Sequence, residues 1–135
     1  MIRLCLYTPE GTILDEDVVS FAAPSLKGPL QIVGGYTPIF ESLAEAGILK
    51  VEKENGINYY AIFHSSLRVE PMKALLCCAN AEVGYDIDTA RANDSLKRAK
   101  ARLEEKNENI DVARAKASMT RALVRLEAKA LSEGS

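Results

Sequence analysis

Four arginines in the last third of the chain form the pattern with the clearest chemical meaning. Arg91 and Arg98 lie seven residues apart, on one face of a helix, and Arg121 and Arg125 lie four apart on a face of another. If the two helices fold back near residue 108, Arg91 lies level with about Arg125 and the four guanidinium groups converge. Converging like charges need an anion between them, and arginine suits bidentate contacts to phosphate. The spacing predicts a phosphate-bearing ligand, and a solvated helix face is the alternative interpretation.

Residue types that often carry catalysis or metal binding are sparse elsewhere. His64 is the single histidine, and a strand-end position accounts for it better than nucleophilic catalysis with the neighbouring serines. The acidic run at 15–17 alternates faces on a strand, which separates carboxylates that would have to act as an acid and base pair. Cys5, Cys77 and Cys78 lack the spacing of a metal site and are expected to be buried strand residues. The sequence predicts no catalytic residues and no metal site.

The segment that carries the arginines has helical periodicity and contains neither glycine nor proline between 86 and 126. Apolar residues recur at steps of three and four, which predicts two amphipathic helices. The positions are Ala92, Leu96, Ala99 and Leu103 in the first helix, and Ala115, Met119, Ala122, Leu126 and Ala130 in the second. Asp88 suits the N-cap of the first helix, and Asn109 or Asp111 that of the second. The polar stretch 104–109 predicts the hinge of an antiparallel pair, which we expect to be a moving part because alanine seams bury little area.

The first 85 residues have a different texture. Short runs rich in β-branched and aromatic residues, bounded by Gly, Pro, Asn or Ser, predict strands. These runs fall within 2–9, 11–25, 29–35, 37–43, 47–56, 57–71 and 73–82. The Asn55-Gly56 pair predicts a hairpin with a type I′ turn. Many short strands at this spacing predict a small antiparallel sandwich or a flattened barrel.

Charge also divides the chain into two regions. Residues 1–85 hold six Lys and Arg against ten Asp and Glu, a net charge of −4, whereas residues 86–135 hold eleven against nine, a net charge of +2. We therefore expect a β domain at 1–85 and a helical hairpin at 86–135. A nucleic-acid-binding module is disfavoured, because the basic excess is small and aromatic residues that stack on bases are missing from the hairpin. No run predicts a membrane span or a signal peptide, so a cytosolic or membrane-peripheral location is expected.

Several phrases give the whole chain a resemblance to a known family. They are "GPLQIVGGYTPIFESL" (28–43), "AGILKV" (46–51), "DIDTARA" (86–92), "KRAKARL" (97–103) and "NIDVARAKASMTRALVRL" (109–126). With the order of strands before a hairpin, they resemble the epsilon subunit of the bacterial F-type ATP synthase. The resemblance implies an all-β sandwich of about ten short antiparallel strands followed by two antiparallel helices. It also implies a non-catalytic central-stalk subunit, peripheral on the cytoplasmic face of the membrane.

The resemblance further implies partners and site residues. The partners are the gamma subunit, the ring of c subunits and the alpha and beta catalytic subunits, whose ATP hydrolysis the mobile hairpin would inhibit. Some bacterial members bind ATP on the folded hairpin, as a regulatory ligand rather than a required cofactor. The positions that match that motif are Glu82, Ile87, Asp88, Arg91, Ala92, Arg98, Arg121 and Arg125. A free-standing ATP-binding sensor outside the synthase is the alternative function.

Two further surfaces are expected from the same resemblance. Arg114, Lys116, Arg121 and Arg125 would dock on the catalytic subunits when the hairpin extends. A loop containing Gly28, Pro29, Gln31 and Tyr36 would contact the c ring. In this loop the chain departs from the family's usual Gly-x-Leu-Gly and Pro-Gly-His phrases.

Overall fold

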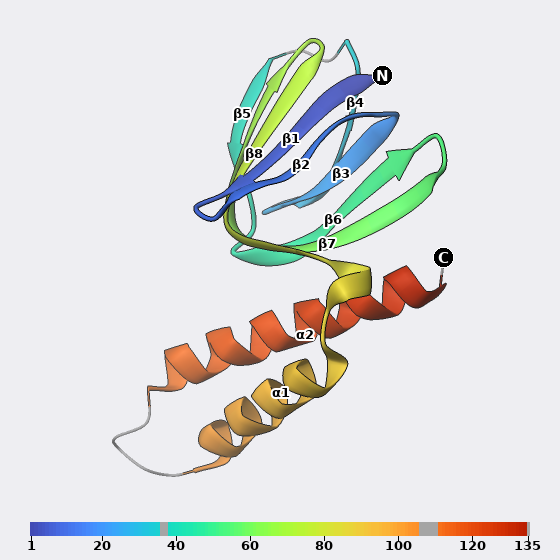
Figure 1. The fold of residues 1–135 in the computed structure, drawn as a ribbon. Coiled ribbons are helices and arrows are strands. Elements are labelled where there is room, and N and C mark those ends of the chain that lie inside the picture. Colours follow the sequence, from blue (N-terminus) through green and yellow to red (C-terminus); the bar gives the residue numbers. More distant parts are fainter. Residues whose placement is uncertain (36–37, 106–110, 135) are drawn as a thin grey trace.

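The computed structural model describes residues 1–35, 38–105 and 111–134, and places strands before helices (Figure 1). The strands are β1 (Ile2–Thr8), β2 (Gly11–Val18), β3 (Ser20–Ser25), β4 (Gly28–Val33), β5 (Ile39–Ser42), β6 (Ala46–Lys53), β7 (Gly56–Glu70) and β8 (Lys73–Val83). A 3₁₀ turn, η1 (Gly84–Asp86), leads into the helices α1 (Thr89–Glu104) and α2 (Val112–Gly134). The change from strands to helices falls at η1, close to the expected boundary after residue 85.

The strands form a sandwich-like sheet whose two layers face each other across one apolar core (Figure 1). The strand order is β2-β1-β8-β7-β6-β3-β4, and β5 pairs with β7 outside this path. The side chains that fill the core come from most of the strands and include Leu4, Phe21, Ile32, Leu49, Leu67 and Leu76. Alternation along each strand sends these residues inward and their neighbours outward. The predicted sandwich followed by a helical hairpin is confirmed.

The strand count and pairing differ in detail from the expectation of about ten antiparallel strands. The described residues form eight strands, partly because β7 runs for 15 residues and serves both layers. Its first half pairs with β6 and its second half with β5. Between them, His64 has a positive φ of 48° and does not pair with β8, whose register is the same on both sides. A single residue in this left-handed conformation bends the strand at the point where its partner changes. The pair β1 and β8 is parallel, so the sheet is mixed.

The predicted hairpin at 53–56 forms, but the type I′ turn is wrong. Lys53 pairs with Gly56, which leaves Glu54 and Asn55 as the two loop residues. A type I′ turn needs positive φ at both loop residues, and neither has one. The positive φ of 145° falls on Gly56 instead, where the absence of a Cβ removes its steric cost.

The helix α2 packs on the outside of the sandwich, and α1 packs on the opposite side of α2 (Figure 1). Each N-cap is an aspartate: Asp88 accepts a hydrogen bond from the Arg91 backbone N–H at 3.1 Å, and Asp111 accepts one from that of Arg114 at 3.0 Å. Of the two predicted caps for α2, Asp111 therefore caps it, and Asn109 lies outside the described residues. Most of the predicted hinge at 104–109 also lies outside them.

The alanine seams are only partly as predicted. Ala92 and Ala99 of α1 and Ala115 and Ala122 of α2 are buried, as expected of two helices packed through small residues. The second helix, however, has another buried face. Ala128 is fully buried against Ala61, Phe63 and Ile87, whereas Ala130, predicted for the seam, is exposed. The reason is that the C-terminal half of α2 packs on the sandwich, which rotates the buried face away from the seam.

Candidate nucleotide site between the sandwich and the hairpin

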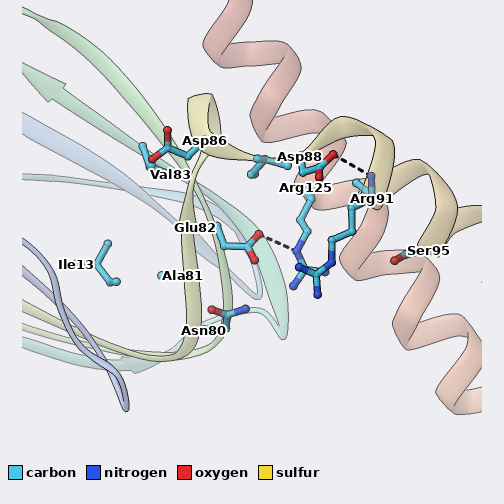
Figure 2. Close-up of a pocket in the computed structure, with 12 residues that line it drawn as sticks. Ile13, Asn80, Ala81, Glu82, Val83, Asp86, Asp88, Arg91, Ser95 and Arg125 are labelled. Atoms are coloured by element: carbon cyan, nitrogen blue, oxygen red, sulfur yellow. Dashed lines mark hydrogen bonds and ion pairs between the residues drawn. The ribbon is translucent and has the colours of Figure 1, made fainter.

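A pocket of about 580 Å³ opens where the last strand meets the hairpin (Figure 2). Its lining comes from β2, β8, η1, α1 and α2, so neither the sandwich nor the hairpin forms it alone. The lining residues are Ile13, Asn80, Ala81, Glu82, Val83, Asp86, Ile87, Asp88, Arg91, Ala92, Ser95 and Arg125. The volume lies in the range of sites that take small ligands, roughly 300–1,000 Å³.

Six of the eight positions expected to bind ATP line this pocket. Glu82, Ile87, Asp88, Arg91, Ala92 and Arg125 all take part in its wall. The other two, Arg98 and Arg121, lie outside the lining, and each donates to a serine three residues earlier on its own helix. Arg98 Nη2 lies 3.3 Å from Ser95 Oγ, and Arg121 Nη2 lies 3.1 Å from Ser118 Oγ. The structure thus brings two of the four arginines into the pocket, in place of the expected convergence of four.

Arg125 is held by two partners from the sandwich. Its Nε lies 2.8 Å from Glu82 Oε2, and its guanidinium carbon lies 4.8 Å from the centroid of the Phe63 ring. The side chains of Arg125 and Glu82 are 24% and 36% exposed, so water screens their attraction only in part. The arginine therefore has a defined place in the pocket before any ligand arrives.

Arg91 approaches the same place from the first turn of α1. Its backbone is fixed by the Asp88 cap, and its side chain points toward that of Arg125, which lines the same pocket (Figure 2). The Glu82 carboxylate faces the two cations, whereas the side chain of Asp86 points away from them (Figure 2). The lining also includes Asp88, whose carboxylate caps α1, so an anion would share the guanidinium donors with carboxylates already present.

The pocket also contains residues that the sequence reasoning missed. Asn80 lies two residues before Glu82 on β8, so both side chains belong to the same face of the strand, and this period-2 relation could have identified it. Ile13 comes from β2, nearly seventy residues away along the chain, and only the fold brings it there. Phe63 is likewise absent from the motif, although its ring lies under Arg125.

The residues expected to meet other subunits lie mostly on the surface. Arg114 and Lys116 are exposed on α2, while Arg121 and Arg125 are half-buried in the folded hairpin. The expected c-ring positions Gly28, Pro29 and Gln31 are exposed too, but they belong to the edge strand β4 rather than to a loop. Tyr36 lies outside the described residues.

The cysteines show no arrangement for thiol or metal chemistry. Cys5 and Cys78 are buried, as predicted, and burial raises the pKa of the Cys78 thiol. Cys77 is exposed, which corrects the expectation for it, because β8 alternates and turns this side chain outward beside Tyr7. Among the residues that the structure describes, no three His, Cys, Asp or Glu side chains are grouped so as to hold a metal ion. None of the described helices is both long and apolar enough to span a membrane.

Comparison with known proteins identifies the family. A family model described as "ATP synthase, Delta/Epsilon chain, long alpha-helix domain" matches residues 86–130. The ATP synthase epsilon chain of Anoxybacillus flavithermus is 34% identical over 105 residues, 78% of each chain. That of Carboxydothermus hydrogenoformans is 36% identical over 102 residues, which is 76% of this chain and 75% of the other. The chain belongs to the ATP synthase epsilon chain family.

Solved structures share the epsilon fold. A chain in the cryo-EM structure of the Euglena gracilis mitochondrial ATP synthase, OSCP/F1/c-ring, superposes with a TM-score of 0.70 at 24% identity, covering 98% of this chain and 79% of that one. A chain in the Tetrahymena thermophila mitochondrial ATP synthase central stalk/c-ring structure gives 0.60 at 17% identity, covering 95% and 96%. These likenesses show the fold, because this chain shares the strand-then-helix arrangement along nearly its whole length.

Proposed function

We propose that this epsilon-family chain is a non-catalytic central-stalk subunit that links the rotor to the membrane ion ring and inhibits ATP hydrolysis through its helical hairpin. In the folded hairpin, the pocket binds ATP as a regulatory ligand. The observation that supports the nucleotide part is that Arg91 and Arg125, from different helices, line one pocket and point toward each other (Figure 2). Neither helix has both cations, so a phosphate that contacts both can do so only while the hairpin is folded.

This dependence makes the nucleotide a regulator of conformation. A ligand shifts an equilibrium only by its differential affinity for the two states. Extension of the hairpin would separate Glu82 and Asn80 on the sandwich from Arg91 and Arg125 on the helices, and the site would be lost. ATP therefore favours the folded, non-inhibiting state by an amount that grows with its concentration.

The proposed partners follow from the same switch. The sandwich contacts the gamma subunit and the c ring, with Gly28, Pro29, Gln31 and Tyr36 at the ring, on the cytoplasmic face of the membrane. When the hairpin extends, Arg114, Lys116, Arg121 and Arg125 meet acidic surfaces of the alpha and beta catalytic subunits. Arg125 would then exchange its carboxylate partner on the sandwich for one on another subunit.

Calorimetric titration of the full chain with ATP tests the nucleotide site. Arg91→Ala and Arg125→Ala should each weaken binding about tenfold or more, because each removes a charge-assisted contact worth about 1.5–3 kcal/mol. Arg102→Ala is the matched control, since Arg102 is exposed on α1 and outside the pocket lining, and its affinity should equal that of the wild type. Equal affinities for all three variants and the wild type would reject the arginine site.

A further inference from the structure

The second helix packs very closely against the chain at Gly84, the first residue of η1. A Cβ built on this glycine would lie 2.5 Å from the carbonyl oxygen of Ala128 and would overlap the hydroxyl of Ser132, both on α2. Gly84 does not have a positive φ, so backbone conformation does not require a glycine there. The requirement is space: α2 crosses η1 so closely that any side chain would displace it.

Other contacts hold the same stretch of α2 in place. Lys129 Nζ donates to the carbonyl oxygen of Tyr85 at 2.8 Å, and Ala128 is fully buried against the sandwich. Arg125 lies one turn before Ala128 on this face of the helix, where it reaches Glu82 and the Phe63 ring. The position of α2 over Gly84 therefore fixes where the Arg125 guanidinium enters the pocket.

We infer that Gly84 is a positioning residue for the pocket: its missing side chain seats the C-terminal half of α2 on the sandwich, keeps the hairpin docked without a ligand, and sets Arg125 beside Arg91. Gly84 does not itself line the pocket, and the recognised arginine pattern does not include it. The docking part of this inference stands by itself. Its consequence for nucleotide affinity rests on the proposed function.

Hydrogen exchange of the full chain without nucleotide tests the docking part. In Gly84→Ala, the amides of α1 and α2 should exchange about tenfold to hundredfold faster, because overpacking against a backbone carbonyl cannot be relieved by a rotamer change. The amides of the sandwich core should keep their wild-type rates. A variant whose helices exchange as slowly as those of the wild type would overturn the inference.

Two glycine controls separate this effect from crowding or helix propensity in general. Gly134→Ala adds a Cβ with nothing within 4 Å, at the end of the same helix, and should change no exchange rate beyond the last turn. Gly34→Ala would crowd the carbonyl oxygen of Met1 at 2.8 Å, within the sandwich, and should loosen strands but not helices. If the helix amides exchanged as fast in Gly34→Ala as in Gly84→Ala, docking of the helices would not depend specifically on Gly84. That result would also overturn the inference.

A second variant covers the case in which Gly84→Ala fails to fold. Lys129→Met removes the hydrogen bond to the Tyr85 carbonyl oxygen without adding bulk next to Gly84. It should therefore speed amide exchange of the helices roughly threefold to tenfold. In the variants that fold, ATP affinity should fall in proportion to the loss of the docked state. If the wild-type chain binds no ATP, the proposed nucleotide site fails, whereas the exchange comparison still decides the role of Gly84.

Discussion

At the scale of single residues, Arg125 combines an ion pair with a contact to an aromatic ring. In the folded hairpin it pairs with Glu82 at 2.8 Å and stacks over Phe63, and in the proposed function it also binds a phosphate. An incoming anion must compete with the Glu82 carboxylate for this guanidinium group. The ion pair thus holds the arginine ready for the ligand and at the same time limits how tightly the ligand can bind.

A double-mutant cycle of Glu82→Gln and Arg125→Gln measures this ion pair without nucleotide. We expect a coupling free energy of about 1 kcal/mol, near the upper end for exposed pairs, because both side chains are partly buried. Urea unfolding followed by the helical circular dichroism signal provides the measurement. The same cycle with Glu127, exposed on the opposite side of α2, should give no coupling. A coupling of zero for Glu82 would show that the pair does not stabilise the folded hairpin.

At the scale of elements, α2 is the connection on which the hairpin depends. One of its faces packs on α1 through Ala115 and Ala122, and another packs on the sandwich through Ala128. α1 packs mainly on α2, so it remains near the sandwich because α2 does. Small residues at this seam let the two helices pack closely, yet they bury little area, so the helices can separate easily.

Ala122→Leu tests the seam between the helices. Ala122 is fully buried, and three added carbon atoms should cost about 1–3 kcal/mol by overpacking and push α1 away from α2. Trypsin should then cleave faster at the lysines and arginines between 97 and 102, while the strands remain resistant. Ala130→Leu is the control, because Ala130 is exposed on the same helix and its substitution should leave the cleavage rate unchanged. Equal resistance of both variants would show that α1 is not held by this seam.

Local features of the sequence predict much of this arrangement, and its long-range contacts explain the rest. The steps of three and four in apolar residues predict both helices. Asp88 predicts where the first begins, and Asp111, one of two candidates with Asn109, where the second begins, because capping acts within one turn. The parallel pairing of β1 with β8 and the presence of Ile13 in the pocket depend on tertiary packing, which no short pattern encodes. The second buried face of α2 at Ala128 was missed for the same reason.

The candidate site, too, could be predicted from the sequence only in part. The motif predicted Glu82 and Arg125 as site residues, and the fold pairs them across 43 positions of sequence. Arg98 and Arg121 fit the spacing argument equally well, but each is turned toward a serine on its own helix. Helical periodicity predicts the helix face on which a side chain lies, but not its rotamer. For this reason only two of the four arginines that were predicted to converge line the pocket.

At the scale of the whole molecule, the sandwich, α2 and α1 form a series in which each layer is held by the one before it (Figure 1). Release of α2 from Gly84 and Glu82 would free both helices together, dismantle the pocket and expose Arg125 for another partner. A single equilibrium would then couple nucleotide binding to inhibition, in keeping with reciprocal linkage between two ligands of one protein. A free-standing sensor would have the same pocket but would not purify with the gamma subunit.

The most direct test of this account is the rate of ATP hydrolysis by the assembled synthase with the chain truncated from Asp88 onward. The sandwich has its own core, so the truncated chain should still assemble with gamma and the c ring and support proton- or sodium-driven synthesis. Without the hairpin, hydrolysis should rise above that of the complex with the full chain. An equal rate of hydrolysis in a complex shown to contain the truncated chain would contradict the proposal that the hairpin inhibits the enzyme.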